Sequence, residues 1–336
     1  MLDLNRLERI SLTANPIGQK AVAAVLLAPN YDLPPRVKID IEGFEHVPDE
    51  PVIYAMNHTD RYNYWPFQYK LWRRYDRFTS TWVKGKYYEN EWMGKFMEMT
   101  NNIPTVSRGY LIARDFKAVC DRAPTGEEYR ALRTAVDVDA GVKEAPDDMV
   151  DPAEIVPRAI LERPRNVLGR RYAPGRESYT TYLNDLFRKM MRRFVEINEQ
   201  AFDKNLDLLV FPQGTRSIRL SRGRIGLSQM ALHLKAPVVP VGCSGSDKVY
   251  PGNSPVGRPG HIIYRMGEAL HYEDMSEFHI GEDFEPFTAE AENKHRDKFQ
   301  GYVDVVMDRI NGLVDPPYRF AEDRASDGVA GSRRFL

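Results

Sequence analysis

Short apolar runs alternate with longer amphipathic stretches along most of the chain. An apolar run bounded by turn residues is typical of a buried strand, whereas apolar positions at helical spacing indicate a helix. The most regular helical pattern covers residues 179–203, where apolar side chains recur roughly every three to four positions. The strands predicted in this way are 37–41, 52–56, 79–83, 103–106, 206–211, 238–241 and 262–266. The other predicted helices are 64–72, 87–99, 225–234 and 289–311.

Strands that alternate with helices predict an α/β fold with a mostly parallel central sheet flanked by helices. In such sheets, the loops after the carboxyl ends of the strands form the functional site. His58, Arg108 and Gln213 each come directly after a predicted strand. Three polar side chains at three strand ends indicate a site at one edge of the sheet.

Between the second and third of these positions, residues 110–178 have a different composition, with frequent Pro, Gly and charged residues. We interpret them as a partly ordered insertion with helical pieces at 110–120, 126–137 and 152–161. The predicted organisation is an N-terminal helical segment at 1–34 and a main domain at 35–320, interrupted by the insertion at about 110–178. The remaining residues, 321–336, are predicted to be a disordered tail.

Composition excludes several classes of protein. A formal net charge of −1 provides no chain-wide basic field for nucleic acid. Cys120 and Cys243 lie far apart and in no pair motif, which argues against disulfides and zinc and favours a reducing, cytoplasmic compartment. The histidines have no metal-ligand spacing, so we expect no metal. A helix that spans a bilayer needs about 20 apolar residues, and no apolar run in the sequence comes close to this length. Any membrane contact is therefore expected to be peripheral.

Phe211–Ser217 follows a predicted buried strand and contains a Gly–Thr–Arg turn. Gly214 allows close approach of the backbone to a ligand, and its amide and those after it can form an anion-binding nest. Arg216 can contact two phosphate oxygens at once. The alternative is a plain strand-to-helix turn whose arginine faces solvent.

His58 lies at the end of a strand and ahead of an aromatic helix, where a histidine can act as a general base. The alternative is a histidine that only forms a hydrogen bond at the strand end. Arg108 is a phosphate ligand only if it converges with Arg216. Five arginines within residues 163–176 either dock on anionic lipid headgroups or form a solvated face.

Four ordered blocks resemble the glycerolipid acyltransferase family of the lysophosphatidic acid acyltransferase type, whose reactions serve phospholipid synthesis. They are Asn57–His58 through Asn63, Ile103–Arg108, Phe211–Ser217 and Val238–Gly242. The resemblance covers about residues 35–109 and 203–270. Order and multiplicity make it more specific than any single block.

The resemblance implies that His58 takes the proton from an acceptor hydroxyl, which attacks the thioester of acyl-CoA or an acyl-carrier protein. Arg108 and Arg216 would hold the phosphate of a glycerol-phosphate or lysophospholipid acceptor, helped by Gly214 and Thr215. No cofactor is implied beyond the thioester co-substrate. The implied location is peripheral, on the cytoplasmic, inner face of a membrane.

Two positions depart from the family's pattern. Asn63 stands where the family has an Asp that orients the histidine, and Gln213 stands where it has a Glu that contacts the acceptor or braces the loop. Asp60 is the nearest carboxylate and a possible substitute. The departures leave a second hypothesis open, a catalytically silent protein that binds lipid or acyl thioester. A hydrolase is disfavoured because no Gly-x-Ser-x-Gly motif is present.

Overall fold

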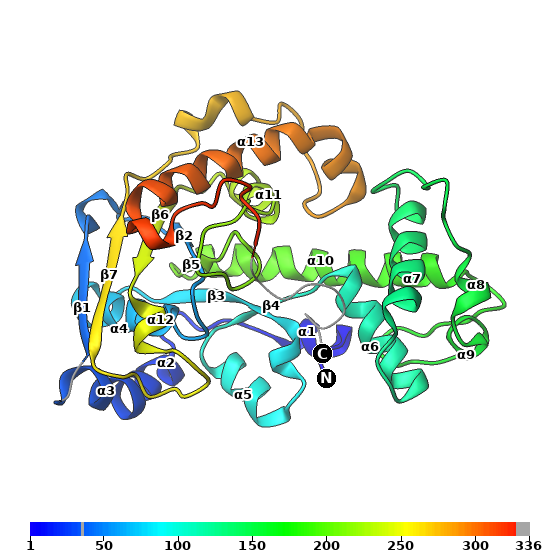
Figure 1. Cartoon of the computed structure of the whole chain (residues 1–336), viewed down its shortest axis with the longest axis horizontal. Coiled ribbons are helices and arrows are strands. Elements are labelled where there is room, and N and C mark those ends of the chain that lie inside the picture. Colours follow the sequence, from blue (N-terminus) through cyan, green and yellow to red (C-terminus); the bar gives the residue numbers. More distant parts are fainter. Residues whose placement is uncertain (35–36, 327–336) are drawn as a thin grey trace.

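The computed structural model describes residues 1–34 and 37–326. At the centre of this described part is a seven-stranded sheet with the strand order β1-β7-β6-β2-β5-β3-β4 (Figure 1). The strands are β1 (Val37–Glu42), β2 (Ile53–Met56), β3 (Thr79–Lys84), β4 (Ile103–Thr105), β5 (Asp207–Val210), β6 (Val238–Ser244) and β7 (Gly260–Met266). Each of the predicted strands is therefore present, with ends shifted by a few residues.

The sheet is mostly parallel, as predicted. Every neighbouring pair is parallel except β6 with β7, so β7 and β1 run opposite to the other strands. β2 is central, with Ile53 opposite Val238 of β6 on one side and Leu208 of β5 on the other. The carboxyl ends of β2, β3, β4 and β5 consequently meet at one edge.

Helices cover both faces of the sheet, which explains why β2, β5 and β6 are buried along their whole length. Ile53 and Ala55 of β2 belong to one apolar cluster, and Tyr54 and Met56 to the other, as alternating side chains require. The first cluster includes α10 (Tyr179–Asp203), α11 (Gly226–Leu234) and α13 (Ala289–Leu313). The second includes α4 (Tyr64–Tyr75) and part of the N-terminal helices.

Residues 1–34 are helical, as expected, but they do not stand apart from the sheet domain. Leu4 and Leu7 are buried in the first apolar cluster, and Leu27 and Tyr31 in the second. The N-terminal helices are α1 (Leu4–Arg9), α2 (Ile17–Val22), η1 (Ala23–Leu27) and α3 (Ala28–Asp32). Further helices are η2 (Phe44–His46), η3 (Gly85–Tyr88), α5 (Glu91–Met99), α12 (Ser246–Val249), η4 (Glu273–Phe278) and η5 (Pro316–Tyr318).

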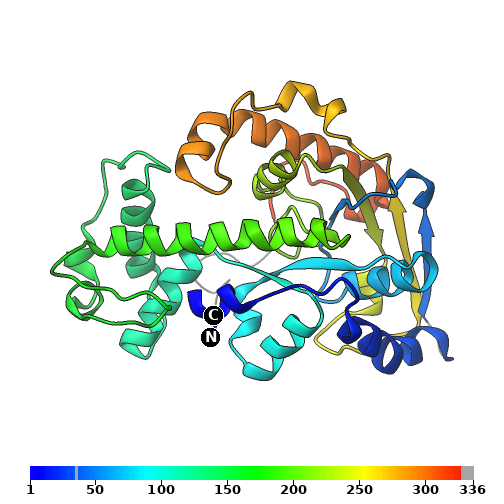
Figure 2. The same ribbon diagram turned by 180° about the vertical axis from the view of Figure 1, so that it is seen from behind.

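The region predicted as an insertion forms a group of helices at the far end of α10 (Figures 1 and 2). They are α6 (Arg108–Cys120), α7 (Gly126–Asp139), α8 (Pro152–Ile155) and α9 (Arg158–Glu162). We name them, with the loop up to residue 178, the helical region. The division of the chain into domains stays a prediction, and most of the predicted tail, from residue 327 on, lies outside the described residues.

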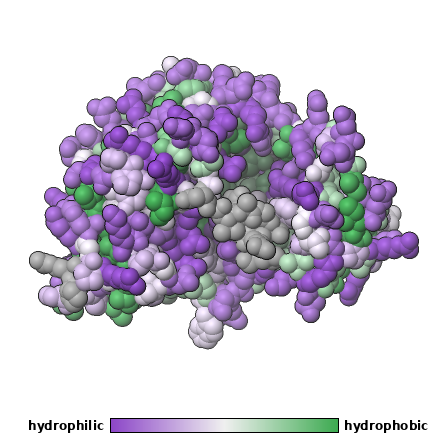
Figure 3. Space-filling view, viewed as in Figure 1, coloured by the Kyte–Doolittle hydropathy of each residue, from purple (hydrophilic) through white to green (hydrophobic). Residues whose placement is uncertain are grey.

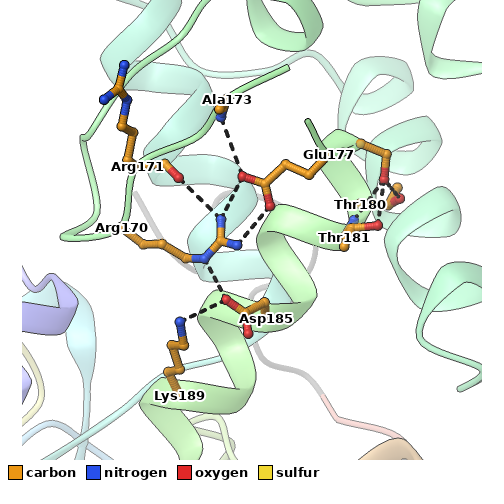
Figure 4. A network of polar contacts seen from close by, with 9 residues as sticks. Arg170, Arg171, Ala173, Glu177, Thr180, Thr181, Asp185 and Lys189 are labelled. Atoms are coloured by element: carbon orange, nitrogen blue, oxygen red, sulfur yellow. Dashed lines mark hydrogen bonds and ion pairs between the residues drawn. The ribbon is translucent and has the colours of Figure 1, made fainter. Parts of the chain in front are cut away.

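Two arginines of the basic cluster 163–176 hold this helical region together. Arg165 forms an ion pair with Asp115, and the two side chains are only 5% and 0% exposed. Arg170 donates hydrogen bonds to Glu177 and to Asp185 of α10 (Figure 4). The cluster is therefore not the single solvent-facing patch that the lipid-docking hypothesis requires.

The surface is mostly hydrophilic in the view of Figure 3, and its hydrophobic residues lie in small separate groups. Across residues 1–34 and 37–326, no helix combines the length and the apolar character that crossing a membrane requires.

Candidate active site

A pocket of about 1190 Å³ opens at the carboxyl edge of the parallel strands. His58 enters it after β2, Lys84 from the end of β3, and Arg216 from the loop after β5. Part of the wall comes from Thr105, Val106 and Ser107 at the end of β4. The loops at the ends of these strands thus line one pocket, and its use as a functional site stays a prediction.

His58 is held by the loop that follows β5. Its backbone N–H donates to Oε1 of Gln213 at 3.0 Å, and its carbonyl accepts from the Ser217 N–H at 2.9 Å. Its ring stacks on Phe211 with 4.0 Å between centroids and 17° between planes. The histidine motif and the Phe211–Ser217 loop are therefore one connected unit.

Asn63 occupies the histidine-orienting position. Its Oδ1 lies 3.1 Å from Nδ1 of His58, and its Nδ2 donates to the Asn57 carbonyl at 2.8 Å. Because Nδ2 of Asn63 donates to that carbonyl, the amide oxygen faces the ring, and Nδ1 of His58 is the donor. Nε2 of His58 is then unprotonated and can accept a proton.

This geometry avoids the usual penalty of an Asn beside a catalytic histidine. In the Ser-His-Asp triad, an Asp-to-Asn change costs about 10⁴-fold in kcat because the histidine takes the wrong tautomer. Here the second hydrogen bond of Asn63 fixes its orientation, so the correct tautomer is kept. The amide still cannot neutralise an imidazolium.

Gln213 braces the site and does not line the pocket. Its side chain is 1% exposed, and its Nε2 donates to the Arg219 carbonyl at 3.2 Å while Oε1 accepts from His58. Our assignment of Gln213 as a substrate-binding residue is therefore corrected to a positioning residue. The position needs one acceptor and one donor, which a glutamine supplies and an ionised glutamate does not.

Asn57, which we did not single out as a functional side chain, follows the same rule. Its Oδ1 accepts from the Cys243 N–H at 2.6 Å, and its Nδ2 donates to the Cys243 carbonyl at 2.9 Å. The side chain ties the loop after β2 to β6. Its position immediately after a buried strand was a signal that could have identified it.

Asp60 does not replace the missing carboxylate. Its Oδ1 accepts from the Tyr62 N–H at 2.8 Å and its Oδ2 from the Thr59 hydroxyl at 3.0 Å. Burial raises its pKa. It lines the pocket, but within the described residues it forms no hydrogen bond with His58, so its role is to stabilise the turn before α4.

Arg108 points away from Arg216. It is the first residue of α6, is 9% exposed, and donates from Nε to Asn184 Oδ1 of α10 at 3.0 Å. Its guanidinium lies 4.3 Å from the centroid of the Phe187 ring. The expected convergence of Arg108 and Arg216 is not present. The reason is that Ser107 caps the helix two residues earlier than predicted, which turns Arg108 toward α10.

Other cations line the pocket, where we expected Arg108 to lie. The lysines and arginines that line the pocket are Arg61, Lys84, Lys86, Arg216 and Arg224. Among the residues that the structure describes, Arg61, Lys86, Arg216 and Arg224 form no ion pair with a carboxylate. Lys84 satisfies the same criterion as His58, a polar residue at a strand end, and could have been identified from it.

The loop's backbone differs from the predicted nest in one respect. Gly214 has the positive φ of 67° that favours glycine, but its N–H donates to the Phe211 carbonyl at 3.0 Å and so closes the turn. Within the described part of the chain, the N–H groups of Thr215 and Arg216 donate to no protein acceptor. Of the loop's amides, these two are therefore the ones available to an anion.

Electrostatics keep His58 neutral. Burial of the ring, together with the positive charges of Arg216 and Lys84, holds the pKa of His58 well below its usual value of 6.5, and the hydrogen bond to Asn63 offsets this in part. Burial and the charges of Arg216 and Arg61 likewise lower the pKa of Lys86. The pocket thus combines a neutral histidine, which has the right form for a general base, with a concentration of positive charge.

Comparisons with known proteins give little further information. No family model matches the chain, and no curated protein matches it. Among solved structures, the chain is similar to the 1-acyl-sn-glycerophosphate (LPA) acyltransferase PlsC from Thermotoga maritima, with 14% sequence identity and a TM-score of 0.39. The match covers 92% of this chain and 79% of that one. A likeness at this level does not place the chain in a family.

Proposed function

We propose that this protein transfers an acyl group from a thioester to the hydroxyl of a glycerol-phosphate or lysophospholipid acceptor. The observation that carries the proposal is the presence in one pocket of His58, with Nε2 free to accept a proton, and a group of cations. A base beside an anion site suits an alcohol that carries a phosphate.

In the proposed reaction, the acceptor's phosphate lies against Arg216 and the neighbouring lysines. Its hydroxyl donates to Nε2 of His58, which takes the proton as the oxygen attacks the thioester carbonyl. The C–O bond forms and the C–S bond breaks, and the protonated His58 returns its proton to the leaving thiolate. Such a base typically contributes about 10²- to 10⁴-fold in rate, and positioning supplies the remainder.

The size and walls of the pocket support two substrates. Its volume of about 1190 Å³ exceeds the roughly 300–1,000 Å³ of ordinary small-molecule sites. Apolar side chains from β3, α5, α11 and the residue that follows β4 line one part of it and suit an acyl chain; they are Trp82, Val83, Met97, Leu227 and Val106. The donor in this proposal is acyl-CoA or an acyl-carrier protein, which share the reacting thioester.

The proposed setting is the cytoplasmic surface of a membrane, from which a lipid acceptor would enter. Trp92 and Met93 of α5 line the pocket, and they are 82% and 43% exposed. Tryptophan favours the interface between membrane and water. This placement supports peripheral contact at the rim of the pocket.

The alternative is a catalytically silent protein that binds lipid or acyl thioester. It is suggested by the two amides, Asn63 and Gln213, which stand where the family that the chain resembles has carboxylates. Against it, both amides use an acceptor and a donor, and together they orient His58.

Transfer of a labelled acyl group from acyl-CoA or acyl-carrier protein to lysophosphatidate or glycerol 3-phosphate separates these functions. The wild type should transfer, and His58→Ala should lose about 10²- to 10⁴-fold in kcat. His271→Ala, outside the pocket lining, is the matched control. Equal background transfer by wild type and His58→Ala with every donor and acceptor would favour the catalytically silent protein. Release of free fatty acid without an acceptor would indicate a hydrolase.

A further inference from the structure

One part of the pocket is apolar and lies against the first turn of α11. Its lining comes from β3, β5, the residue after β4 and the start of α11; the residues are Trp82, Val210, Val106, Gly226 and Leu227. We name this part the apolar end. Because side chains alternate along a strand, Trp82 lies on the same face of β3 as Lys84 and about 7 Å before it. The apolar end therefore continues the pocket inward from the strand ends, where His58 enters it.

The indole of Trp82 is fixed in place by α10. Its Nε1 donates to Oδ1 of Asn198 at 2.7 Å, and Nδ2 of Asn198 donates to the Phe194 carbonyl at 2.6 Å. Asn198 is fully buried, so turning the indole away would separate a buried amide oxygen from its donor, which costs free energy. The ring is therefore held in one orientation at the apolar end.

Aromatic rings of the core stand behind the indole. The ring of Phe194 meets Trp82 edge-on with 4.9 Å between centroids, and Phe287 packs edge-on against Phe194 at 5.5 Å. Phe194 is only 2% exposed. Protein interiors are packed as densely as organic crystals. A chain that reaches Trp82 from the pocket therefore meets close-packed rings.

Gly226, the first residue of α11, leaves space beside the indole. A Cβ atom added there would lie 3.5 Å from Cε1 of Phe287 and 3.9 Å from Cζ3 of Trp82, which is ordinary van der Waals contact. Gly226 does not have a positive φ, so its backbone conformation does not require glycine. A side chain at this position would fit the fold and would take up room in the apolar end.

We propose that Trp82, held by Asn198, ends the binding site for the acyl chain of the donor, and that Trp82 and Gly226 together set the longest chain that fits. This inference rests on the proposed function and deepens it, because it names the residues that select the transferred group. In a hydrophobic site, one methylene more or less changes kcat/KM by about 10- to 200-fold. A fixed indole at the end of the site therefore discriminates sharply between donors of different length.

The apolar end suits the donor's chain better than a chain of the acceptor. The transferred chain has to lie in the pocket, because its carbonyl is attacked beside His58. A chain on a water-soluble carrier also gains the full benefit of leaving water. The chain of a lipid acceptor can stay at the exposed rim, where Trp92 and Met93 lie.

The test measures kcat/KM for a series of saturated acyl-CoA and acyl-carrier protein donors, from medium to long chain, with one fixed acceptor. Gly226→Ala adds one methyl group beside the indole and should lower kcat/KM about tenfold for the longest donor that the wild type uses well. The shortest donors should be almost unaffected, and Gly226→Leu should move the limit to still shorter chains. Alanine has a higher helix propensity than glycine, so the fold should not be weakened by Gly226→Ala.

Gly252 provides the matched control. It lines the same pocket in the loop after α12, and no described atom lies within 4 Å of a Cβ added there. Gly252→Ala and Gly252→Leu make the same chemical changes away from the indole and should leave the donor profile as in the wild type. A profile that is unchanged in both Gly226 variants, or that shifts equally in the Gly252 variants, overturns the proposal.

Trp82→Phe and Asn198→Ala should act in the opposite direction. A smaller ring, or an indole released from its hydrogen bond, opens the apolar end. Donors longer than the wild-type limit should then gain about tenfold or more relative to the best wild-type donor. A purely structural role would lower activity alike at every chain length, and that result would contradict the role of the indole.

Binding measurements separate this inference from the proposed function. S-alkyl phosphopantetheine thioethers carry the part that both donors share and cannot react, and calorimetry gives their affinity as a function of chain length. A shift of this profile in Gly226→Leu without any acyl transfer keeps the inference and removes the proposed function. Acyl transfer with the same donor profile in wild type and Gly226→Leu does the reverse, and absence of both binding and transfer removes both.

A second series distinguishes the two chains. Here the donor is fixed and the chain of lysophosphatidate is varied. Gly226→Leu should leave this acceptor profile as in the wild type. A shift in the acceptor profile in place of the donor profile would assign the apolar end to the acceptor and overturn the proposal.

Discussion

The pocket and the helical region use arginine in opposite ways. In the helical region, Arg165 and Arg170 are paired with Asp115, Glu177 and Asp185. In the pocket, and within the described residues, Arg61, Arg216 and Arg224 have no carboxylate partner. Two of the five arginines in the denser basic cluster are thus structural, and the sparser set of cations forms the candidate anion site.

The reason is that a buried charge and a charge at the wall of a pocket have different surroundings. A buried guanidinium such as Arg165 is tolerated only because Asp115 and backbone carbonyls surround it. The cations that line the pocket repel one another, which weakens the fold slightly, and a bound anion would relieve that repulsion. Pairing, which depends on tertiary structure, therefore separates the two roles better than charge density along the chain.

The largest expected effect is on the structural side of this comparison. Asp115→Ala leaves Arg165 buried without its counter-charge and should lower the free energy of unfolding by about 3–5 kcal/mol, measured by urea denaturation. Asp185→Ala is the control, since Arg170 keeps Glu177 and the side chain of Asp185 is 37% exposed; its effect should stay below about 1 kcal/mol. Similar losses in both variants would mean that burial does not distinguish the two pairs.

Arg216→Gln should give the opposite pattern. Loss of charge-assisted hydrogen bonds to a phosphate costs about 1.5–3 kcal/mol, so kcat/KM for a phosphate-bearing acceptor should fall about 10- to 100-fold. The melting temperature should stay within about one or two degrees of the wild type, because Arg216 forms no ion pair with the residues that the structure describes. A large drop in stability with unchanged kcat/KM would show that Arg216 belongs to the structural class.

The pH dependence should show that His58 is neutral in the free enzyme. An ordinary histidine of pKa near 6.5 is about three quarters protonated at pH 6, and its activity would fall accordingly. Because the pKa of His58 is lowered, kcat/KM should show no such loss at pH 6. Below pH 6.5 the unfolded chain binds a proton at this residue that the folded chain does not, so the free energy of unfolding should decrease as the pH is lowered, and His58→Gln should flatten that dependence.

The smallest effect should come from Arg176→Ala. This exposed arginine belongs to the basic cluster 163–176 but takes part in none of the three ion pairs that Arg165 and Arg170 form. Stability should change by less than about 0.5 kcal/mol, and transfer to lysophosphatidate in anionic vesicles should equal that of the wild type. A clear loss of activity on vesicles alone would restore the lipid-docking hypothesis for this cluster.

The sequence was informative where structure is local. Residues 179–203 are helical with both predicted ends, because the apolar spacing is a local pattern within one segment. The strands were predicted for the same reason, since an apolar run is also a local pattern. His58, Asn63 and Arg216 could be identified because each lies in a short sequence motif. The direction of a side chain is not local: Arg108 lies where expected along the chain, but the start of α6 and the ring of Phe187 turn it away from the pocket.

The amides illustrate the same limit. Asn63 and Gln213 look like losses when compared position by position with carboxylates. Their second hydrogen bonds, to the carbonyls of Asn57 and Arg219, become visible only in three dimensions, and they show that each position requires a donor as well as an acceptor.

The proposed function requires one pocket to hold an acceptor's phosphate and to bring its hydroxyl to His58. A crystal structure with bound sn-glycerol 3-phosphate measures this directly. We expect the phosphate in contact with Arg216 and a free hydroxyl within about 3.2 Å of Nε2 of His58. A phosphate bound away from Arg216, or a hydroxyl beyond the reach of His58 in an enzyme that still transfers acyl groups, would contradict it.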